Sequence, residues 1–363
     1  MSEKNAGRQE ELLIGISDFG IMHTVPGEFP IDQRFRMVQD ANVFDYIDKT
    51  PEPHEITDYR DAVQRHGIPL TAGGYYYVLG KDEQLLRQHL ELGREFGARV
   101  HNVQVLSRDS QGELVTDEQI AEIYLDAMEW GSTSATIPCF EVHVGMWSEQ
   151  FSRVQRVAEL VERRGLKFNI TLDHSHIVFA IRNRDAQETM GIRSEVEAGA
   201  ITLDPFSNGN ICRNWIEAGL VRHAHARSAV PNGPRNQWMA GLDGRPGLAL
   251  QYPFIRPNAG QWHSEWDESL LETWKFAISK LLQHHANTPG SRLGTISTEF
   301  IPFADYGGGA KYSLFENNIA CATWIRAEWE RLSRNELTPP ATNGSSSQKT
   351  SMPKKVRAAD SLP

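Results

Sequence analysis

The chain has 363 residues with 40% apolar side chains, a net charge of −10 and a pI of about 5.7. This acidic balance disfavours a nucleic-acid substrate, because nucleic-acid enzymes neutralise phosphates with a basic face. No run of about 18 apolar residues is present to cross a membrane, and the polar start MSEKNAGRQE lacks the apolar segment of a secretory signal. Three cysteines without a C-x-x-C pair indicate neither a disulfide framework nor a zinc–thiolate site, so we expect a cytoplasmic protein.

Short apolar runs alternate with amphipathic stretches along the first half of the chain, as in repeated βα units. Strands are predicted at residues 12–21, 42–48, 68–79 and 99–106. Helices are predicted around residues 34–39 and at 54–67, 82–98 and 116–131. Gly67 and Gly97 suit helix C-caps, and Thr116 with Glu118 or Gln119 indicates an N-terminal cap.

The same alternation continues through the second half. Strands are predicted at residues 138–146, 167–179, 221–230 and 295–303, and helices at 151–165, 267–285 and 315–332. An irregular stretch follows the sixth strand, and a long segment rich in Gly, Pro and Trp follows the seventh, from Pro231 to Trp266. Eight βα units in one chain predict a closed (β/α)8 TIM barrel.

The competing architecture is a doubly wound open sheet. That fold usually carries a glycine-rich phosphate loop after an early strand, and neither G-x-G-x-x-G nor a P-loop motif occurs here. We therefore predict an α/β fold with one TIM barrel over residues 12–335 and a long loop between strand seven and helix seven. The tail at 337–363, rich in Pro, Ser and Lys without apolar periodicity, is predicted to be disordered.

Strands five to eight each end in a carboxylate or a histidine, namely Glu141, Asp173, His225 and Glu299. In a barrel the carboxyl ends of all strands meet at one mouth. Any one of these residues alone would suit a helix cap, a surface charge or a core histidine, but four on successive strands are hard to explain that way. Three converging carboxylates need a cation, so we predict one divalent metal ion. Oxygen donors with one imidazole favour Mn²⁺ or Mg²⁺, and Co²⁺, Zn²⁺ and Fe²⁺ are the other candidates.

Two short motifs extend this pattern. The sixth strand contains D-x-x-H at Asp173–His176, and the seventh contains H-x-H at His223–His225. With them the chain resembles the xylose-isomerase-like TIM-barrel superfamily, of the sugar phosphate isomerase/epimerase type, from about residue 12 to residue 335. That group includes sugar 3-epimerases, hydroxypyruvate isomerases, inosose dehydratases and the endonuclease IV class of repair enzymes.

The resemblance implies the ligand set Glu141, Asp173, His225 and Glu299, and implies that His176 contacts substrate. Two departures leave the substrate open. The signatures of true xylose isomerases are not apparent, and HARSAVPNGPRNQW follows the seventh strand where many epimerases have an acidic, asparagine-rich stretch before a substrate-binding arginine.

The predicted chemistry is proton transfer next to a carbonyl. A metal ion chelated by a hydroxyl and a neighbouring carbonyl stabilises an enediolate, and two carboxylates can then move the proton between faces. The resemblance implies these roles for Glu141 and Glu299. His143 is either an additional base or a hydrogen-bond partner, and His176 and Arg227 are predicted to bind substrate oxygens.

Aromatic residues of the segment after strand seven predict a lid over the substrate, with Trp238 and Trp262 as substrate contacts. The alternative is that Trp238, Trp262 and Trp266 bury the long loop or form a dimer contact. The three tyrosines at 75–77, and His23 near the end of strand one, are candidates for the other side of the mouth. Such bulk favours a substrate larger than a triose, such as a glycoside or an aromatic metabolite.

The leading function is a metal-dependent isomerase or epimerase of a sugar or related α-hydroxy ketone. A lyase with the same enediolate chemistry, acting as a keto-cyclitol dehydratase or a C-glycoside-cleaving enzyme, is the first alternative. The others are a non-catalytic binding barrel and a metal-dependent nuclease, for which His66 and His101 would have to be extra ligands. The expected partner is a small carbohydrate-like or hydroxy-ketone molecule, with no nucleic acid and no membrane, and a homo-oligomer is compatible with the sequence.

Overall fold

The computed structural model describes residues 11–21, 29–241 and 244–336. The predicted disordered tail and His23 lie outside these ranges. None of the helices in the described ranges is both long and apolar enough to cross a membrane.

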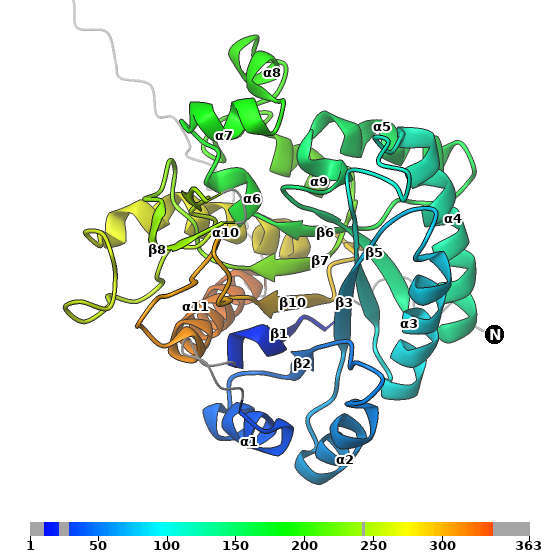
Figure 1. Cartoon of the computed structure of the whole chain (residues 1–363), viewed down its shortest axis with the longest axis horizontal. Helices are drawn as coiled ribbons and strands as arrows, with labels where there is room; N and C mark the ends of the chain where they lie inside the picture. Colours follow the sequence, from blue (N-terminus) through cyan, green and yellow to red (C-terminus); the bar gives the residue numbers. More distant parts are fainter. Residues whose placement is uncertain (1–10, 22–28, 242–243, 337–363) are drawn as a thin grey trace, which may run out of the picture.

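Eight parallel strands form a closed barrel at the centre of the molecule (Figure 1). In barrel order they are β1 Leu13–Ser17, β2 Tyr46–Asp48, β3 Ala72–Tyr77, β4 Val100–Val105, β5 Ile137–Val142, β6 Ile170–Asp173, β7 Val221–Ala226 and β10 Thr295–Thr298. The last strand closes the barrel on the first, with Leu13 beside Thr295 in the register. The predicted TIM barrel is confirmed.

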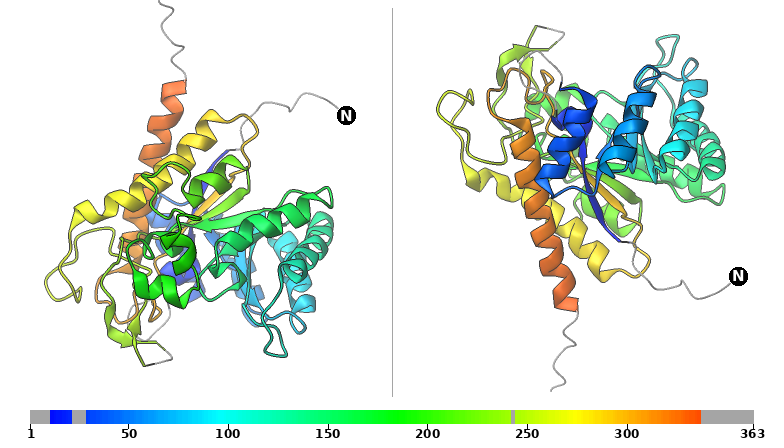
Figure 2. Two further views of the ribbon diagram at one scale, coloured as in Figure 1. Left: turned by 90° about the horizontal axis from the view of Figure 1, so that it is seen from above. Right: turned by 90° about the horizontal axis from the view of Figure 1, so that it is seen from below.

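Helices surround the barrel, with α3, α4 and α5 on one side and α10 and α11 on the opposite side (Figure 1). The barrel helices are α1 Ile31–Ala41, α2 Ile56–His66, α3 Glu83–Phe96, α4 Asp117–Ser134, α5 Ser152–Glu162, α10 Glu272–Asn287 and α11 Leu314–Glu336. Helices α10 and α11 pack against each other (Figure 2). Short helices fill the β6–β7 connection, namely α6 Ser175–Val178, α7 Arg184–Thr189, α8 Arg193–Glu197 and α9 Ile211–Glu217.

Local sequence signals set the ends of several helices. Thr116 and Gln119 form a reciprocal capping box, in which each side chain accepts a hydrogen bond from the other residue's backbone N–H. Gly67 and Gly97 end α2 and α3 with φ of 71° and 73°, a left-handed conformation that costs glycine little. These predicted caps are confirmed.

The sixth strand is shorter than predicted. It ends at Asp173, whose Oδ1 accepts a hydrogen bond from the backbone N–H of Ser175 at 2.8 Å and so turns the chain into α6. All four residues of α6 are buried. A buried helix and a buried strand both appear as a continuous apolar run, so the sequence could not separate them.

The long segment after β7 is confirmed and covers one side of the mouth. It contains the small antiparallel pair β8 Asn236–Ala240 and β9 Pro246–Gly247. The 3-10 helix η3 Glu268–Leu271 follows this segment and leads into α10, within the stretch predicted as a helix. The Asn236 amide ties the long segment to the loop after β10 by donating to the carbonyls of Ala304 and Gly308. The two segments therefore form one layer beside the barrel mouth.

A tyrosine fills part of the barrel interior below the mouth. Tyr46 on β2 is fully buried, and its hydroxyl lies 2.9 Å from Ser297 Oγ on β10, the other neighbour of β1. Gly15 on β1 leaves room for this ring, because a Cβ there would come within 2.3 Å of it. This packing joins three adjacent strands beneath the candidate site.

Candidate metal centre

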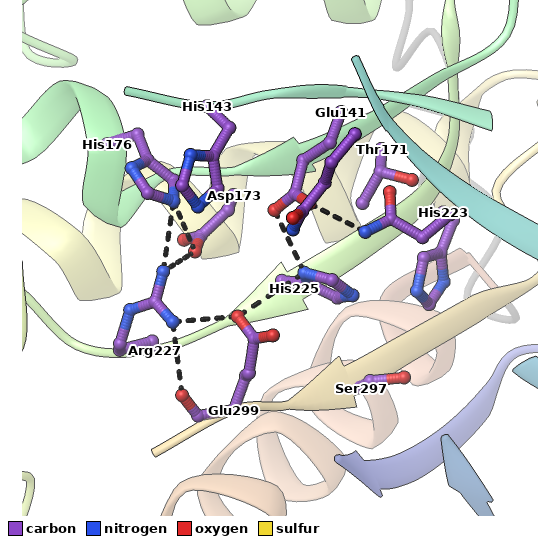
Figure 3. Close-up of polar contacts among 12 residues, drawn as sticks. Glu141, His143, Thr171, Asp173, His176, His223, His225, Arg227, Ser297 and Glu299 are labelled. Carbon is purple, nitrogen blue, oxygen red and sulfur yellow. Dashed lines mark hydrogen bonds and ion pairs between the residues drawn. The ribbon is translucent and has the colours of Figure 1, made fainter. Parts of the chain in front are cut away.

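Glu141, Asp173, His225 and Glu299 converge at the carboxyl end of the barrel (Figure 3). One ligand atom from each lies within 4.8 Å of the others. His225 Nδ1 is 3.1 Å from Glu141 Oε1 and 3.4 Å from Glu299 Oε2. The structure thus brings together all four residues that the sequence suggested as ligands.

Strand geometry explains this convergence. Alternate residues of a strand face the same side, and all barrel strands are parallel. Glu141 and His225 are the penultimate residues of β5 and β7, Asp173 is the last residue of β6, and Glu299 directly follows β10. Asp173 and His225 are also direct partners in the strand register. The cluster therefore depends on the barrel's register.

Strand β4 supplies two amides that hold Glu141. Asn102 Nδ2 and Gln104 Nε2 both donate to Glu141 Oε2, at 2.6 and 2.5 Å. Neither residue was among the predicted site residues. The available signal was two amide side chains at alternate positions of the strand, which therefore face the same side. Both amides leave Glu141 Oε1 facing His225.

Arg227 lies beside the cluster, fully buried. Its guanidinium pairs with Asp173, donates to Glu299 Oε2 at 2.7 Å and lies 3.0 Å from His176 Nε2 (Figure 3). It also stacks 4.2 Å from the ring centre of Tyr306, a residue that the sequence analysis missed. Arg227 and His176, predicted to bind substrate, thus contact the proposed ligands directly.

His143 follows the end of β5 and belongs to this same group. Its ring packs against that of His176, with 3.9 Å between the centres, and its Nε2 lies 3.0 Å from the Tyr306 hydroxyl. A hydroxyl partner and a packed ring hold His143 in place. His143 thus has a hydrogen-bond partner, and its role as an additional base stays a prediction.

The electrostatics of the cluster indicate a place for a cation. Burial raises the pKa of Asp173 to about 6, and the charges of Glu299 and Glu141 add to this while Arg227 opposes it. Burial would raise the pKa of Glu141 as well, but the neighbouring His225 holds it well below its usual range. The pKa of His225 is raised above its usual value by Glu299 and Glu141 despite burial. The protonated His225 supplies positive charge to these carboxylates, and a divalent ion can supply it instead when His225 gives up its proton and coordinates as a neutral imidazole.

Two further groups have comparable spacing, Asp48 with His223 and His225, and Glu141 with His143 and His176. Both share residues with the main cluster. The other histidines considered for a multi-metal centre lie elsewhere. His66 ends α2 and bonds Asp32, and His101 is turned toward Tyr77 and α3. The described structure therefore does not bring His66 or His101 to the cluster.

A cavity of about 160 Å³ opens next to the cluster, on the β1–β4 side of the mouth. Its lining consists of Ser17, Asp18, Phe19, Asp48, Lys49, Thr50, Glu52, Gly74, Tyr75, Tyr76, Asn102, Gln104, His225 and Glu299. Tyr77 instead faces His89 and His101. The predicted substrate contacts Trp238 and Trp262 do not line this cavity. Trp238 packs on His263 and Trp262 on Tyr252 and Tyr312, within the loop layer.

No protein-family model matches the sequence, and no curated protein matches it. Solved structures do match. An L-ribulose 3-epimerase is 14% identical with a TM-score of 0.53, over 92% of this chain and 99% of that one. A D-psicose 3-epimerase from Clostridium cellulolyticum H10, solved with D-tagatose, is 12% identical with a TM-score of 0.51, over 87% and 99%. A D-allulose 3-epimerase from Methylomonas sp., in complex with D-allulose, is 10% identical with a TM-score of 0.51, over 90% and 98%. These matches show that the chain shares the barrel fold of these epimerases.

Proposed function

We propose that this protein is a divalent-metal-dependent isomerase or epimerase of a sugar or related α-hydroxy ketone. The observation that carries the proposal is the convergence of three carboxylates and one imidazole beside a cavity at the barrel mouth. Similarity in fold to epimerases solved with D-allulose and D-tagatose supports a sugar as the substrate class.

Glu141, Asp173, His225 and Glu299 would hold the ion, and Mn²⁺ or Mg²⁺ suits this oxygen-rich set best. When bound, such an ion polarises a substrate carbonyl and stabilises negative charge on the neighbouring hydroxyl carbon as a Lewis acid. The amides of Asn102 and Gln104 orient Glu141. Arg227 orients Asp173 and Glu299.

Glu299 is the stronger candidate for the proton-transferring base, because it borders the cavity whereas Glu141 lies behind His225 and the amides. Glu141 does not line the cavity, so in this proposal it serves as a metal ligand and not as the second proton-transferring group. Proton transfer by a positioned carboxylate contributes about 10²- to 10⁴-fold to a rate. Removing the Glu299 carboxylate charge while keeping its shape should therefore remove most of the activity.

Hydrogen exchange tests this proposal. The Mn²⁺-loaded protein is incubated in deuterated water with a panel of ketoses and keto-glycosides, and deuterium uptake next to the carbonyl is followed by mass spectrometry. We expect exchange with at least one sugar, and about 10²- to 10⁴-fold slower exchange for Glu299→Gln with its metal retained. Glu91→Gln, an exposed carboxylate on α3, is the control.

A complete lack of exchange across the panel would refute the proposal. Unchanged exchange by Glu299→Gln would refute the role of this residue as base. Release of water or an aglycone, instead of a product of equal mass, would assign the lyase alternative.

A further inference from the structure

Three large aromatic side chains are exposed around the open half of the mouth. Phe19, Tyr76 and Phe303 are 41%, 53% and 47% exposed. They follow or end β1, β3 and β10, so all lie at the carboxyl end of the barrel. The rings of Phe19 and Phe303 meet edge to face at 5.3 Å, and Tyr76 stacks on Tyr75 at 4.9 Å. We call Phe19, Tyr75, Tyr76 and Phe303 the aromatic rim.

The aromatic rim is continuous with the cavity of the proposed active site. Phe19, Tyr75 and Tyr76 line the same cavity as His225 and Glu299. Its volume of about 160 Å³ is smaller than the ~300–1,000 Å³ of pockets that enclose larger ligands. The cavity is therefore too small to enclose a sugar together with a second ring, and a longer substrate would continue outward across the exposed rings.

Within the described ranges, the cavity wall offers an anionic substrate no free lysine or arginine. Asp18, Asp48 and Glu52 contribute carboxylates to the lining, of which Asp18 pairs with Arg34 at 2.6 Å and Asp48 lies 3.4 and 3.6 Å from His223 and His225. The only lysine in that lining, Lys49, lies 3.1 Å from Glu55 and 4.0 Å from Asp18, and it is thus neutralised by the protein. An uncharged ring, in contrast, would gain contact area against the aromatic rim.

We propose that the substrate is an uncharged keto sugar that carries a flat aromatic group. The sugar occupies the cavity with its α-hydroxy ketone toward His225 and Glu299, and the aromatic group stacks outside it on Phe19 and Tyr76. This assignment rests on the proposed function and adds the substrate class to it. It also gives the exposed rings a role that a free monosaccharide would leave unexplained.

A matched pair of sugars tests the assignment. The probes are 3-keto-D-glucose and 4-nitrophenyl 3-keto-β-D-glucopyranoside, titrated into the Mn²⁺-loaded protein by calorimetry. We expect the nitrophenyl sugar to bind at least about tenfold more tightly, because two aromatic contacts add to its affinity. Phe19→Ala and Tyr76→Ala should each reduce this ratio of affinities by about two- to tenfold.

Phe206→Ala is the matched control, since Phe206 is a similarly exposed phenylalanine, 56% exposed, which stacks on Phe276 between α9 and α10. The ratio of affinities of Phe206→Ala for the two sugars should equal that of the wild type. Equal affinities of the wild type for the two sugars, or a ratio that both rim variants leave unchanged, would overturn the assignment. A dimer that Phe19→Ala converts to monomer in sedimentation, with the ratio unchanged, would make the rim an interface between copies instead.

The two proposals fail in different ways. If both sugars bind equally and undergo hydrogen exchange, the substrate assignment fails and the proposed function stands. If neither sugar binds or exchanges and no ketose does, both fail.

Discussion

The two halves of the barrel mouth differ in chemistry. Strands β5, β6, β7 and β10 contribute the charged cluster, which Arg227 and Tyr306 close off. Strands β1 to β4 contribute amides, aromatic rings and the open cavity. In the proposed function, one barrel mouth therefore separates two tasks. The charged half would carry out the reaction, and the open half would select the substrate.

Removing the imidazole of His225 should have the largest effect on metal affinity, because His225 is a proposed ligand in the charged half. We expect His225→Ala to lower the affinity for Mn²⁺ by more than ~100-fold, since even the residues that support metal ligands contribute about 10- to 100-fold. The loss also leaves the buried carboxylates of Glu141 and Glu299 without their shared partner. Titration calorimetry with Mn²⁺ measures the change.

His223→Ala provides the comparison on the same strand. His223 faces the barrel interior two residues earlier and bonds Thr295. A larger loss of Mn²⁺ affinity in His223→Ala than in His225→Ala would place the ion in the group of Asp48 and His223, contrary to our assignment.

An intermediate effect on metal affinity should follow when an amide of the open half no longer holds Glu141 in the charged half. Asn102→Ala removes a 2.6 Å hydrogen bond to Glu141, and we expect about a 10- to 100-fold loss of Mn²⁺ affinity or exchange rate. The same substitution at Asn214, on the outer helix α9, should change neither. If Asn102→Ala retains full affinity and full exchange, Glu141 does not need its amides, and the two halves act independently.

A third effect concerns the pH dependence of stability and arises at His101, in the wall behind the open half. Burial lowers the pKa of His101 to about 3, compared with roughly 6.5 in an unfolded chain. Between these two pKa values His101 is protonated in the unfolded chain and neutral in the folded chain. Its contribution to the free energy of unfolding is therefore complete above about pH 6.5 and is lost as the pH falls toward 3.

This contribution has a defined slope. Between about pH 6 and pH 4 it should fall by about 1.4 kcal/mol per pH unit. Urea unfolding at several pH values should show that His101→Leu reduces the pH dependence of the free energy of unfolding by this amount. His54→Leu, at an exposed histidine, should leave that pH dependence unchanged. Parallel curves for the wild type and His101→Leu would contradict the burial of a neutral ring at this position.

The sequence determined the parts of the fold that local patterns encode. Alternating apolar runs and amphipathic stretches predicted the eight βα units, because strand and helix periods differ. Gly67, Gly97 and the pair Thr116 and Gln119 predicted helix ends through backbone conformation and capping, which need no distant partner. The ligand candidates also followed from local position, since each stands at the end of a strand and parallel strands end together.

Tertiary structure alone decided what surrounds the four residues. Tyr306 and Arg227 meet only because the loop after β10 returns across the mouth, and Asn102 reaches Glu141 only because β4 and β5 pair in the closed barrel. The path of the loops also places Trp238 and Trp262 within the loop layer. The cavity lies instead beside Tyr75 and Tyr76. Periodicity fixes which way a residue faces on its own strand. The neighbours it meets depend on barrel closure and on loop paths, which link residues far apart in the chain.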